Sequence, residues 1–154
     1  MKDLKASDLM SREVVRVSPK ATALEAAKAL LASGKSGLPV VDDQGRLIGI
    51  VSEADLLRRP EVATAAVHSS EFFTNELADR LLECLGRPVE EMMTRKVASV
   101  LGNTPLMAIA ELLETMRLKW VPVTERGKVV GVVTRADVLR AFVAAAESSG
   151  VLAA

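Results

Sequence analysis

Residues 49–58 read GIVSEADLLR, and residues 131–140 read GVVTRADVLR. The same pattern therefore occurs twice in the chain. In each copy a short apolar run, typical of a buried β-strand, ends at a hydroxyl residue, and an aspartate follows three positions later. Helix-forming residues come next. The pattern predicts a strand that passes directly into a helix, with the corner at Ser52 in the first copy and at Thr134 in the second.

The repeat extends well beyond this motif. Met10 matches Met93, and Pro39 matches Pro122, in both cases 83 positions later. The expected elements of the first copy are a strand at 14–17, a helix from 22, strands at 37–41 and 47–51, and a final helix. Those of the second copy are a strand at 97–100, a helix from 104, strands at 120–123 and 129–133, and a final helix. Short helical turns are expected at 8–12 and 91–95. Each copy thus predicts the order β-α-β-β-α.

Helix starts are marked by capping residues. Thr22 with Glu25 forms a capping-box pattern, and Thr104 precedes a proline that suits the first helical position, Pro105. The first helix is expected to bury Leu24, Ala27 and Leu31, and the second to bury Leu106, Ile109, Leu112, Leu113 and Met116. Because proline cannot donate to a sheet, Pro39 and Pro122 are expected at strand starts or on an edge.

The predicted organisation is a first repeat at 1–59, a connector at 60–89, a second repeat at 90–146 and a flexible tail at 147–154. A half of about 50 residues buries too little surface to be stable alone. We therefore expect an α/β (α+β) fold whose two halves pack through their sheets about a pseudo-twofold axis. Thr74 is expected to cap a connector helix with Leu77, Leu81 and Leu85 on one face. This helix either packs on its own protomer, or forms a dimer contact or a lid.

Composition excludes several classes of function. Twenty basic residues balance twenty acidic ones, which disfavours nucleic acid and anionic membranes as partners. No apolar run is long enough to span a membrane, and the N-terminus lacks a signal-peptide pattern, so a cytoplasmic protein is expected. The lone cysteine, Cys84, excludes an internal disulfide and a multi-cysteine zinc site. His68 and Cys84 have no catalytic pattern around them, which makes a small enzyme the least favoured reading.

The two corners have the chemistry to hold a nucleotide. Unpaired N–H groups at a helix start attract phosphate, and the hydroxyls of Ser52 and Thr134 lie there. Asp55 and Asp137 follow one turn later, and an ionised carboxylate can accept hydrogen bonds from the two hydroxyls of a ribose. The apolar segments 38–39 and 121–122 could sandwich a base. The same Ser/Thr-x-x-Asp spacing is also close to a capping box, which a helix start favours without any ligand.

These residues resemble a tandem pair of cystathionine-β-synthase (CBS) domains. The marks are LPVVD at 38–42 and the strand-to-helix motif at 49–55, with their counterparts VPV at 121–123 and the motif at 131–137. The resemblance covers residues 8–59 and 90–143. It implies a regulatory Bateman module that binds AMP, ADP, ATP or S-adenosylmethionine in two clefts between the repeats. It also implies a homodimer and a regulated enzyme or transporter as partner.

The resemblance further implies that residues two or three before each proline face phosphate. These are Ser36 and Gly37 in the first copy, and Lys119 and Trp120 in the second. Arg135 is a further phosphate candidate, whereas Glu53 at the matching position would repel phosphate. The clefts are therefore expected to be unequal, with the second favoured for an anionic ligand. Lys119 and Arg135 could equally be solvated surface charges, and Trp120 could stack on a base or belong to the core.

The resulting hypothesis is a non-enzymatic sensor of an adenosine-containing ligand, without a covalent cofactor or a metal. The expected ligand-binding residues are Ser52, Asp55, Gly37, Leu38, Pro39, Lys119, Trp120, Val121, Pro122, Thr134, Arg135 and Asp137. The alternative is a ligand-free module for dimerisation or protein interaction. In that alternative the same fold and the connector helix serve to dimerise or to dock on another protein.

Overall fold

The computed structural model describes residues 3–57 and 76–150 of the chain. The described residues divide into two compact units, each named here after the aspartate of its strand-to-helix corner. The Asp55 unit consists of residues 15–43, 48–57 and 76–97. The Asp137 unit consists of residues 3–14, 44–47 and 98–150.

The Asp55 unit is a mixed α and β structure around a two-stranded sheet. Its elements are α2 (Ala23–Ser33), β1 (Gly37–Val41), β2 (Leu47–Ser52), α3 (Glu53–Leu57), α5 (Glu76–Leu85) and the 3-10 helix η1 (Val89–Glu91). Strands β1 and β2 pair with one another. The core is formed by Val17, Ala26, Leu30, Leu38, Val40, Val51, Val89 and Met93.

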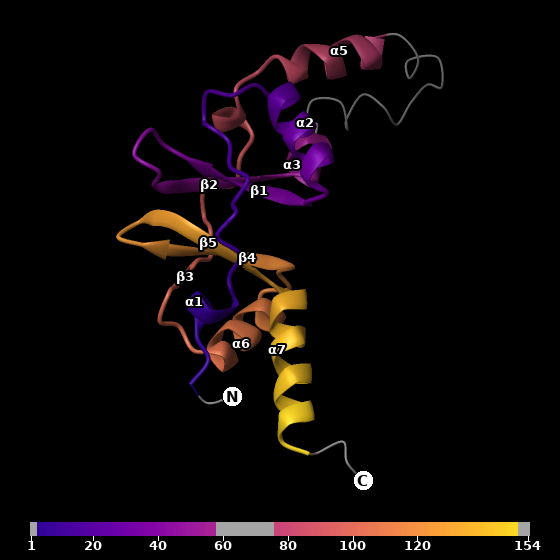
Figure 1. Cartoon of the computed structure of the whole chain (residues 1–154). Helices are drawn as coiled ribbons and strands as arrows, with labels where there is room; N and C mark the ends of the chain where they lie inside the picture. The colour runs from indigo at the N-terminus through magenta and orange to yellow at the C-terminus, as the bar shows by residue number, and fades with distance from the viewer. Residues whose placement is uncertain (1–2, 58–75, 151–154) are drawn as a thin grey trace. The chain divides into compact units, whose positions relative to one another are not determined.

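The Asp137 unit is also a mixed α and β structure, built around a three-stranded sheet (Figure 1). Its elements are α1 (Ala6–Leu9), β3 (Val100–Leu101), α6 (Leu106–Thr115), β4 (Trp120–Glu125), β5 (Lys128–Thr134) and α7 (Arg135–Ser148). Strand β4 lies in the middle, parallel to β3 and antiparallel to β5. The core is formed by Ala6, Val100, Leu106, Ile109, Leu113, Val121, Val123, Val133 and Val138.

The start of α2 confirms the sequence prediction, but its buried face does not. The Glu25 N–H donates to Thr22 Oγ1 at 3.1 Å, and the Thr22 N–H donates to the Glu25 carboxylate at 3.3 Å, which completes the capping box. The buried residues are Ala23, Ala26 and Leu30. The prediction of Leu24, Ala27 and Leu31 was wrong by one position, and Leu31 is 82% exposed. Alanine and leucine occur on two adjacent stripes of this helix, so either stripe could be the buried face as far as the sequence alone can indicate.

The start of α6 differs from the expected cap. Pro105 is the N-cap residue and Leu106 begins the helix, while the Thr104 hydroxyl accepts the Leu101 N–H at 3.0 Å. Thr104 therefore closes the turn before the helix instead of capping it. Leu106, Ile109 and Leu113 are buried, as expected. Leu112, which was also expected to be buried, is half-buried, and Met116, the C-cap residue, is exposed, so the prediction was wrong for Met116.

The first predicted strand of each repeat is reduced in the structure. Residues 14–17 form no strand, and only Val17 makes a parallel bridge, to Val40. In the second copy the strand is β3, at Val100–Leu101 instead of 97–100. The helical turns expected at 8–12 and 91–95 are α1 and η1, which begin two residues earlier. β-branched residues alone did not fix these strands, because a strand requires a partner over its full length.

The segment at the start of each repeat, called here the lead-in segment (residues 10–11 and 93–94), packs on the second hairpin strand of the other repeat. Met10 belongs to the start of the first repeat, yet its side chain lies against Gly131 of β5, and a Cβ at that glycine would clash with it. Met93 belongs to the start of the second repeat and lies in the same way against Gly49 of β2. The following residues, Ser11 and Thr94, exchange backbone hydrogen bonds with the same strands. The two lead-in segments are therefore exchanged between the repeats.

Both prolines lie inside strands, and the expectation of a strand start or an edge holds for one of them. Pro39 lies on β1, an edge strand of its two-stranded sheet, whereas Pro122 lies on the central strand β4. Pro39 and Pro122 are the third residues of β1 and β4. The pairing of β4 with β3 begins only at Val123, so the missing N–H of Pro122 is not required by that ladder. Proline is therefore tolerated in a central strand at a position where the neighbouring strand has not yet begun.

The expected connector helix is present as α5, and it packs against α2. Thr74 and the side chains of Leu77 and Leu81 lie outside the described residues. Helix α7 continues to Ser148 and is followed by a turn at residues 149–150, while the rest of the expected tail lies outside the described residues. Within 3–57 and 76–150, no helix combines the length and the apolar content needed to cross a membrane.

Candidate nucleotide-binding corners

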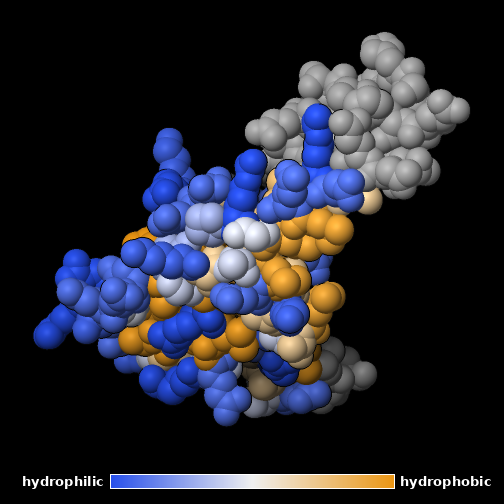
Figure 2. Space-filling view, turned by 90° about the horizontal axis from the view of Figure 1, so that it is seen from above, coloured by the Kyte–Doolittle hydropathy of each residue, from blue (hydrophilic) through white to orange (hydrophobic). Residues whose placement is uncertain are grey.

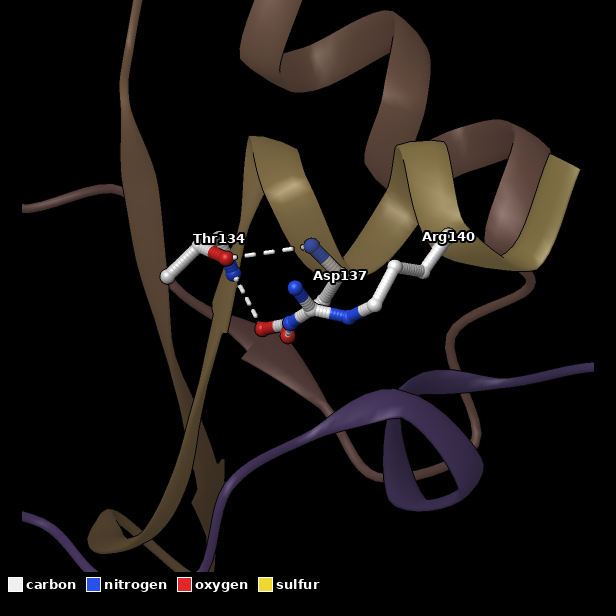
Figure 3. A network of polar contacts seen from close by, with 3 residues as sticks. All are labelled: Thr134, Asp137 and Arg140. Atoms are coloured by element: carbon white, nitrogen blue, oxygen red, sulfur yellow. Dashed lines mark hydrogen bonds and ion pairs between the residues drawn. The ribbon is translucent and has the colours of Figure 1, made fainter. Parts of the chain in front are cut away.

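The Asp137 corner is the junction of β5 and α7 (Figure 3). The Asp137 N–H donates to Thr134 Oγ1 at 3.1 Å, and the Thr134 N–H donates to Asp137 Oδ2 at 2.8 Å. This reciprocal pair is a capping box, so Thr134 and Asp137 do stabilise the start of α7, as the Ser/Thr-x-x-Asp spacing indicated. It uses only one of the two carboxylate oxygens.

The second oxygen of Asp137 is held by an arginine from the next turn of α7. Arg140 Nη2 donates to Asp137 Oδ1 and forms an ion pair with it. The side chain of Arg140 is 71% exposed, and that of Asp137 is 14% exposed. Figure 3 shows the guanidinium folded back over the carboxylate. Asp137 Oδ1 is therefore bound by a long side chain that is largely exposed to water.

The Asp55 corner is closed by the protein itself. Asp55 Oδ2 accepts the Ser52 N–H at 2.8 Å and the Ser52 hydroxyl at 3.0 Å. Asp55 Oδ1 accepts the Thr94 hydroxyl at 3.3 Å, and the Asp55 N–H donates to Ser52 Oγ at 3.2 Å. The residue as a whole is only 6% exposed. Both carboxylate oxygens therefore already serve the fold, which leaves little capacity for a ribose.

The helix starts offer fewer free N–H groups than the sequence argument assumed. The Arg135 N–H donates to the Lys119 carbonyl at 3.0 Å, and the Glu53 N–H donates to the Ser36 carbonyl at 3.1 Å. The amides two residues later are used by the capping bonds just described. Two of the first three helix amides in each corner are therefore satisfied within the protein, so a phosphate would depend more on basic side chains.

The Asp137 corner does bring basic residues together at the entry of β4. Arg135 donates from Nε to the Leu118 carbonyl at 2.6 Å, and its backbone binds the neighbouring Lys119. Both basic side chains are exposed. At the matching positions the Asp55 corner has Ser36 and the acidic Glu53. The expected difference in charge between the corners is thus preserved in the structure.

The apolar residues expected to sandwich a base are mostly part of the core. Leu38 and Val121 belong to the core clusters of their units, and Pro39 and Pro122 are buried beside them. Gly37 is buried and Trp120 is half-buried at the first position of its strand. Of the residues expected to contact a base, Trp120 is therefore the one that retains appreciable exposure.

Sequence reasoning missed two residues that complete the corners. Arg140 lies three positions after Asp137 in a helix, a spacing that places the two side chains together and could have indicated the pair. Thr94 lies 39 positions from Asp55, and no local signal links them. Its role follows from the exchanged lead-in segment that brings it to β2.

Comparison with known proteins agrees with the repeat. The family model described as "CBS domain" matches the chain twice, at residues 6–61 and 89–144. The chain belongs to the CBS-domain family. The two matches confirm the family resemblance and the pair of repeats that the sequence predicts.

A CBS-domain relative is the chloroplastic CBS domain-containing protein CBSX2 of Arabidopsis thaliana. It is 31% identical over 141 residues, a match that covers 84% of this chain and 59% of the relative. This chain therefore spans less than two thirds of that relative's length. The crystal structure of CBSX2 in complex with AMP has a TM-score of 0.69 at 30% identity, covering 90% of this chain and 96% of that chain.

Two further CBS-domain proteins show the range of contexts. The CBS domain pair of protein MJ0100 was solved in complex with 5'-methylthioadenosine and S-adenosyl-L-methionine. It has a TM-score of 0.66 at 27% identity and covers 92% of this chain and 97% of that chain. The A-adding tRNA nucleotidyltransferase of Aquifex aeolicus is 28% identical over 90% of this chain, which corresponds to 14% of the enzyme. CBS repeats thus also form small parts of enzymes.

Proposed function

We propose that this chain is a regulatory CBS-domain pair that binds AMP, ADP, ATP or S-adenosylmethionine and has no catalytic activity of its own. The similarity to CBS pairs solved with AMP and with S-adenosyl-L-methionine supports this ligand class. The regulated partner would be an enzyme or a transporter in the cytoplasm. Binding would act by favouring one of two states of the module, which requires a different affinity for each state.

The Asp137 corner is the better binding site of the two. The observation that carries this proposal is the difference between the aspartates within residues 3–57 and 76–150. There, Asp55 is enclosed by hydroxyl and amide donors, whereas Asp137 Oδ1 is paired with an exposed arginine. A ribose diol would donate to that oxygen. Lys119 and Arg135 would favour a phosphate beside it. Trp120 would contact the base.

A thermal-shift titration with AMP, ATP and S-adenosylmethionine tests the proposal on protein freed of bound nucleotide. Ligand at 100 times its dissociation constant stabilises a protein by about 2.7 kcal/mol. For a chain of this size, that corresponds to a rise in Tm of roughly 5–10 °C. Asp137→Ala should abolish the rise, whereas Lys119→Gln should weaken it for AMP and ATP more than for adenosine.

Two results would contradict this function. If no adenosine ligand raises the Tm, the sensor proposal is refuted. If Asp137→Ala shows the same rise as the wild-type protein, the assignment of the site to the Asp137 corner is refuted. The absence of catalysis is checked separately by incubating the protein with ATP and separating the products by chromatography. Turnover that persists through repurification and is lost in Asp137→Ala would show an enzyme instead.

Exposed apolar side chains support a second proposal, a homodimerisation module. Figure 2 shows hydrophobic side chains reaching the surface among hydrophilic ones. Leu139 and Val143 are exposed on α7, and their spacing of four places them on one face of the helix. Light scattering after gel filtration should give the mass of a dimer, and Leu139→Glu should reduce it to that of a monomer. A monomeric wild-type protein would refute this proposal.

A further inference from the structure

Arg140 is in a position to control access to Asp137. Its guanidinium binds Oδ1, while the other oxygen, Oδ2, is already committed to the Thr134 N–H of the helix cap (Figure 3). The Asp137 side chain is mostly covered although it lies at a helix start, and the arginine that contacts it is mostly exposed. The guanidinium therefore covers the oxygen that an incoming hydroxyl donor would need.

The Asp55 corner provides an internal comparison. The matching oxygen, Asp55 Oδ1, is bound by the neutral hydroxyl of Thr94, which comes from a distant segment and is fixed by backbone hydrogen bonds to β2. Among the described residues, the partner of Asp137 Oδ1 is instead charged, long and attached to the same helix. Arg58, which matches Arg140 in the repeat, lies outside the described residues. Exposed ion pairs of this kind contribute little to stability because water and salt compete with them. The Asp137 pair can therefore open at small cost.

We propose that Arg140 is a latch on the nucleotide corner: it competes with the ribose for Asp137 Oδ1 and must swing away before a ligand binds. This inference rests on the proposed function, because it assigns a role to Arg140 at the same site. Arg140 thus acts as a positioning residue through Asp137. The latch lowers affinity equally for every ribose-containing ligand, and it makes that affinity sensitive to ionic strength.

Isothermal titration of the full chain with AMP and with uncharged adenosine tests the latch. Arg140→Gln should bind both ligands about 2- to 5-fold more tightly, which is the range expected from losing an exposed ion pair. Arg140→Lys, which keeps the charge but loses the planar fork, should lie between the two proteins. Arg12→Gln, at an exposed arginine of the same unit, is the matched control for charge and should leave both affinities unchanged.

Salt separates the latch from a merely structural role. Adenosine carries no charge, so its binding to the wild-type protein should tighten as salt rises from about 20 mM to about 500 mM and screens the Asp137–Arg140 pair. Binding to Arg140→Gln should not change over this range. A structural role for Arg140 would instead give a lower Tm and weaker binding at every salt concentration.

The outcomes distinguish the latch from the underlying function. Weaker AMP binding by Arg140→Gln with unchanged adenosine binding would show a phosphate contact and overturn the latch alone. Equal affinities in the wild-type protein and Arg140→Gln would also overturn it while the proposed function stands. If neither protein binds AMP or adenosine, the proposed function fails and the latch fails with it.

Discussion

Replacing Asp55 should destabilise the protein more than replacing Asp137, although the two aspartates occupy equivalent positions in the repeat. Asp55 accepts a backbone N–H and two hydroxyls in a nearly buried site, with distances of 2.8, 3.0 and 3.3 Å. Asp137 accepts one backbone N–H and an exposed arginine. Asp55→Ala therefore removes three bonds that water replaces poorly, whereas Asp137→Ala removes one such bond.

The expected magnitudes follow from these contacts. Loss of the cap bond costs about 1 kcal/mol in either corner. The two hydroxyl bonds to the Asp55 carboxylate add roughly 1 kcal/mol each, while the exposed ion pair of Asp137 adds at most about 1 kcal/mol. We expect losses of about 2–4 kcal/mol for Asp55→Ala and about 1–2 kcal/mol for Asp137→Ala. At roughly 2–4 °C per kcal/mol, the Tm of Asp55→Ala should fall by about 5–15 °C.

Urea denaturation followed by circular dichroism measures both free energies of unfolding. Thr94→Val serves as the control, because it removes only the Thr94–Asp55 bond and should cost about 0.5–1.5 kcal/mol. In the double variant the two losses should not add, since that bond can be lost only once. Equal losses for the two aspartate variants, or strictly additive losses for Asp55→Ala and Thr94→Val, would refute the view that Asp55 is the structural member of the pair.

Two further predictions concern packing and are measured by the same denaturation assay. Leu30→Ala should cost about 2–5 kcal/mol because Leu30 is 2% exposed, while Leu31→Ala should stay within about 0.5 kcal/mol; similar losses would mean that α2 is rotated. Gly49→Ala should cost about 1–3 kcal/mol, because its Cβ would lie 2.7 Å from Met93 Sδ and 3.0 Å from the Thr94 carbonyl oxygen. Shortening the side chain in Met93→Ala relieves only the first contact, so a full rescue of Gly49→Ala by that change would contradict the role of the backbone.

Local patterns in the sequence predicted the parts of the fold that depend on neighbouring residues. The capping box at Thr22 and the strand-to-helix corners at Ser52 and Thr134 lie where they were expected. The face of α2 was misjudged because an alanine stripe was overlooked beside a leucine stripe. Small residues can line a core wherever another element approaches closely, and hydrophobicity alone underestimates them.

Long-range contacts set the limit of the prediction for the candidate site. The carboxylates were identified from their spacing, but their environments differ for reasons that lie elsewhere in the chain. Thr94 reaches Asp55 because its segment pairs with β2. Leu38 and Val121 are buried in the cores of their units and so are not exposed to a base. A repeat in sequence therefore predicted two equivalent corners, and the tertiary structure makes them chemically different.

Because the lead-in segments are exchanged, each repeat depends on the other to complete its packing. A fragment ending before residue 60 would keep Met10 without the glycine it covers, and would leave Gly49 without Met93. Each half on its own would therefore leave a strand without its partner, because β5 would lose the backbone bonds from Ser11 and β2 those from Thr94. Both repeats are therefore needed on one chain, and a substitution at Met10 acts on β5, the strand that leads into the Asp137 corner more than a hundred residues away.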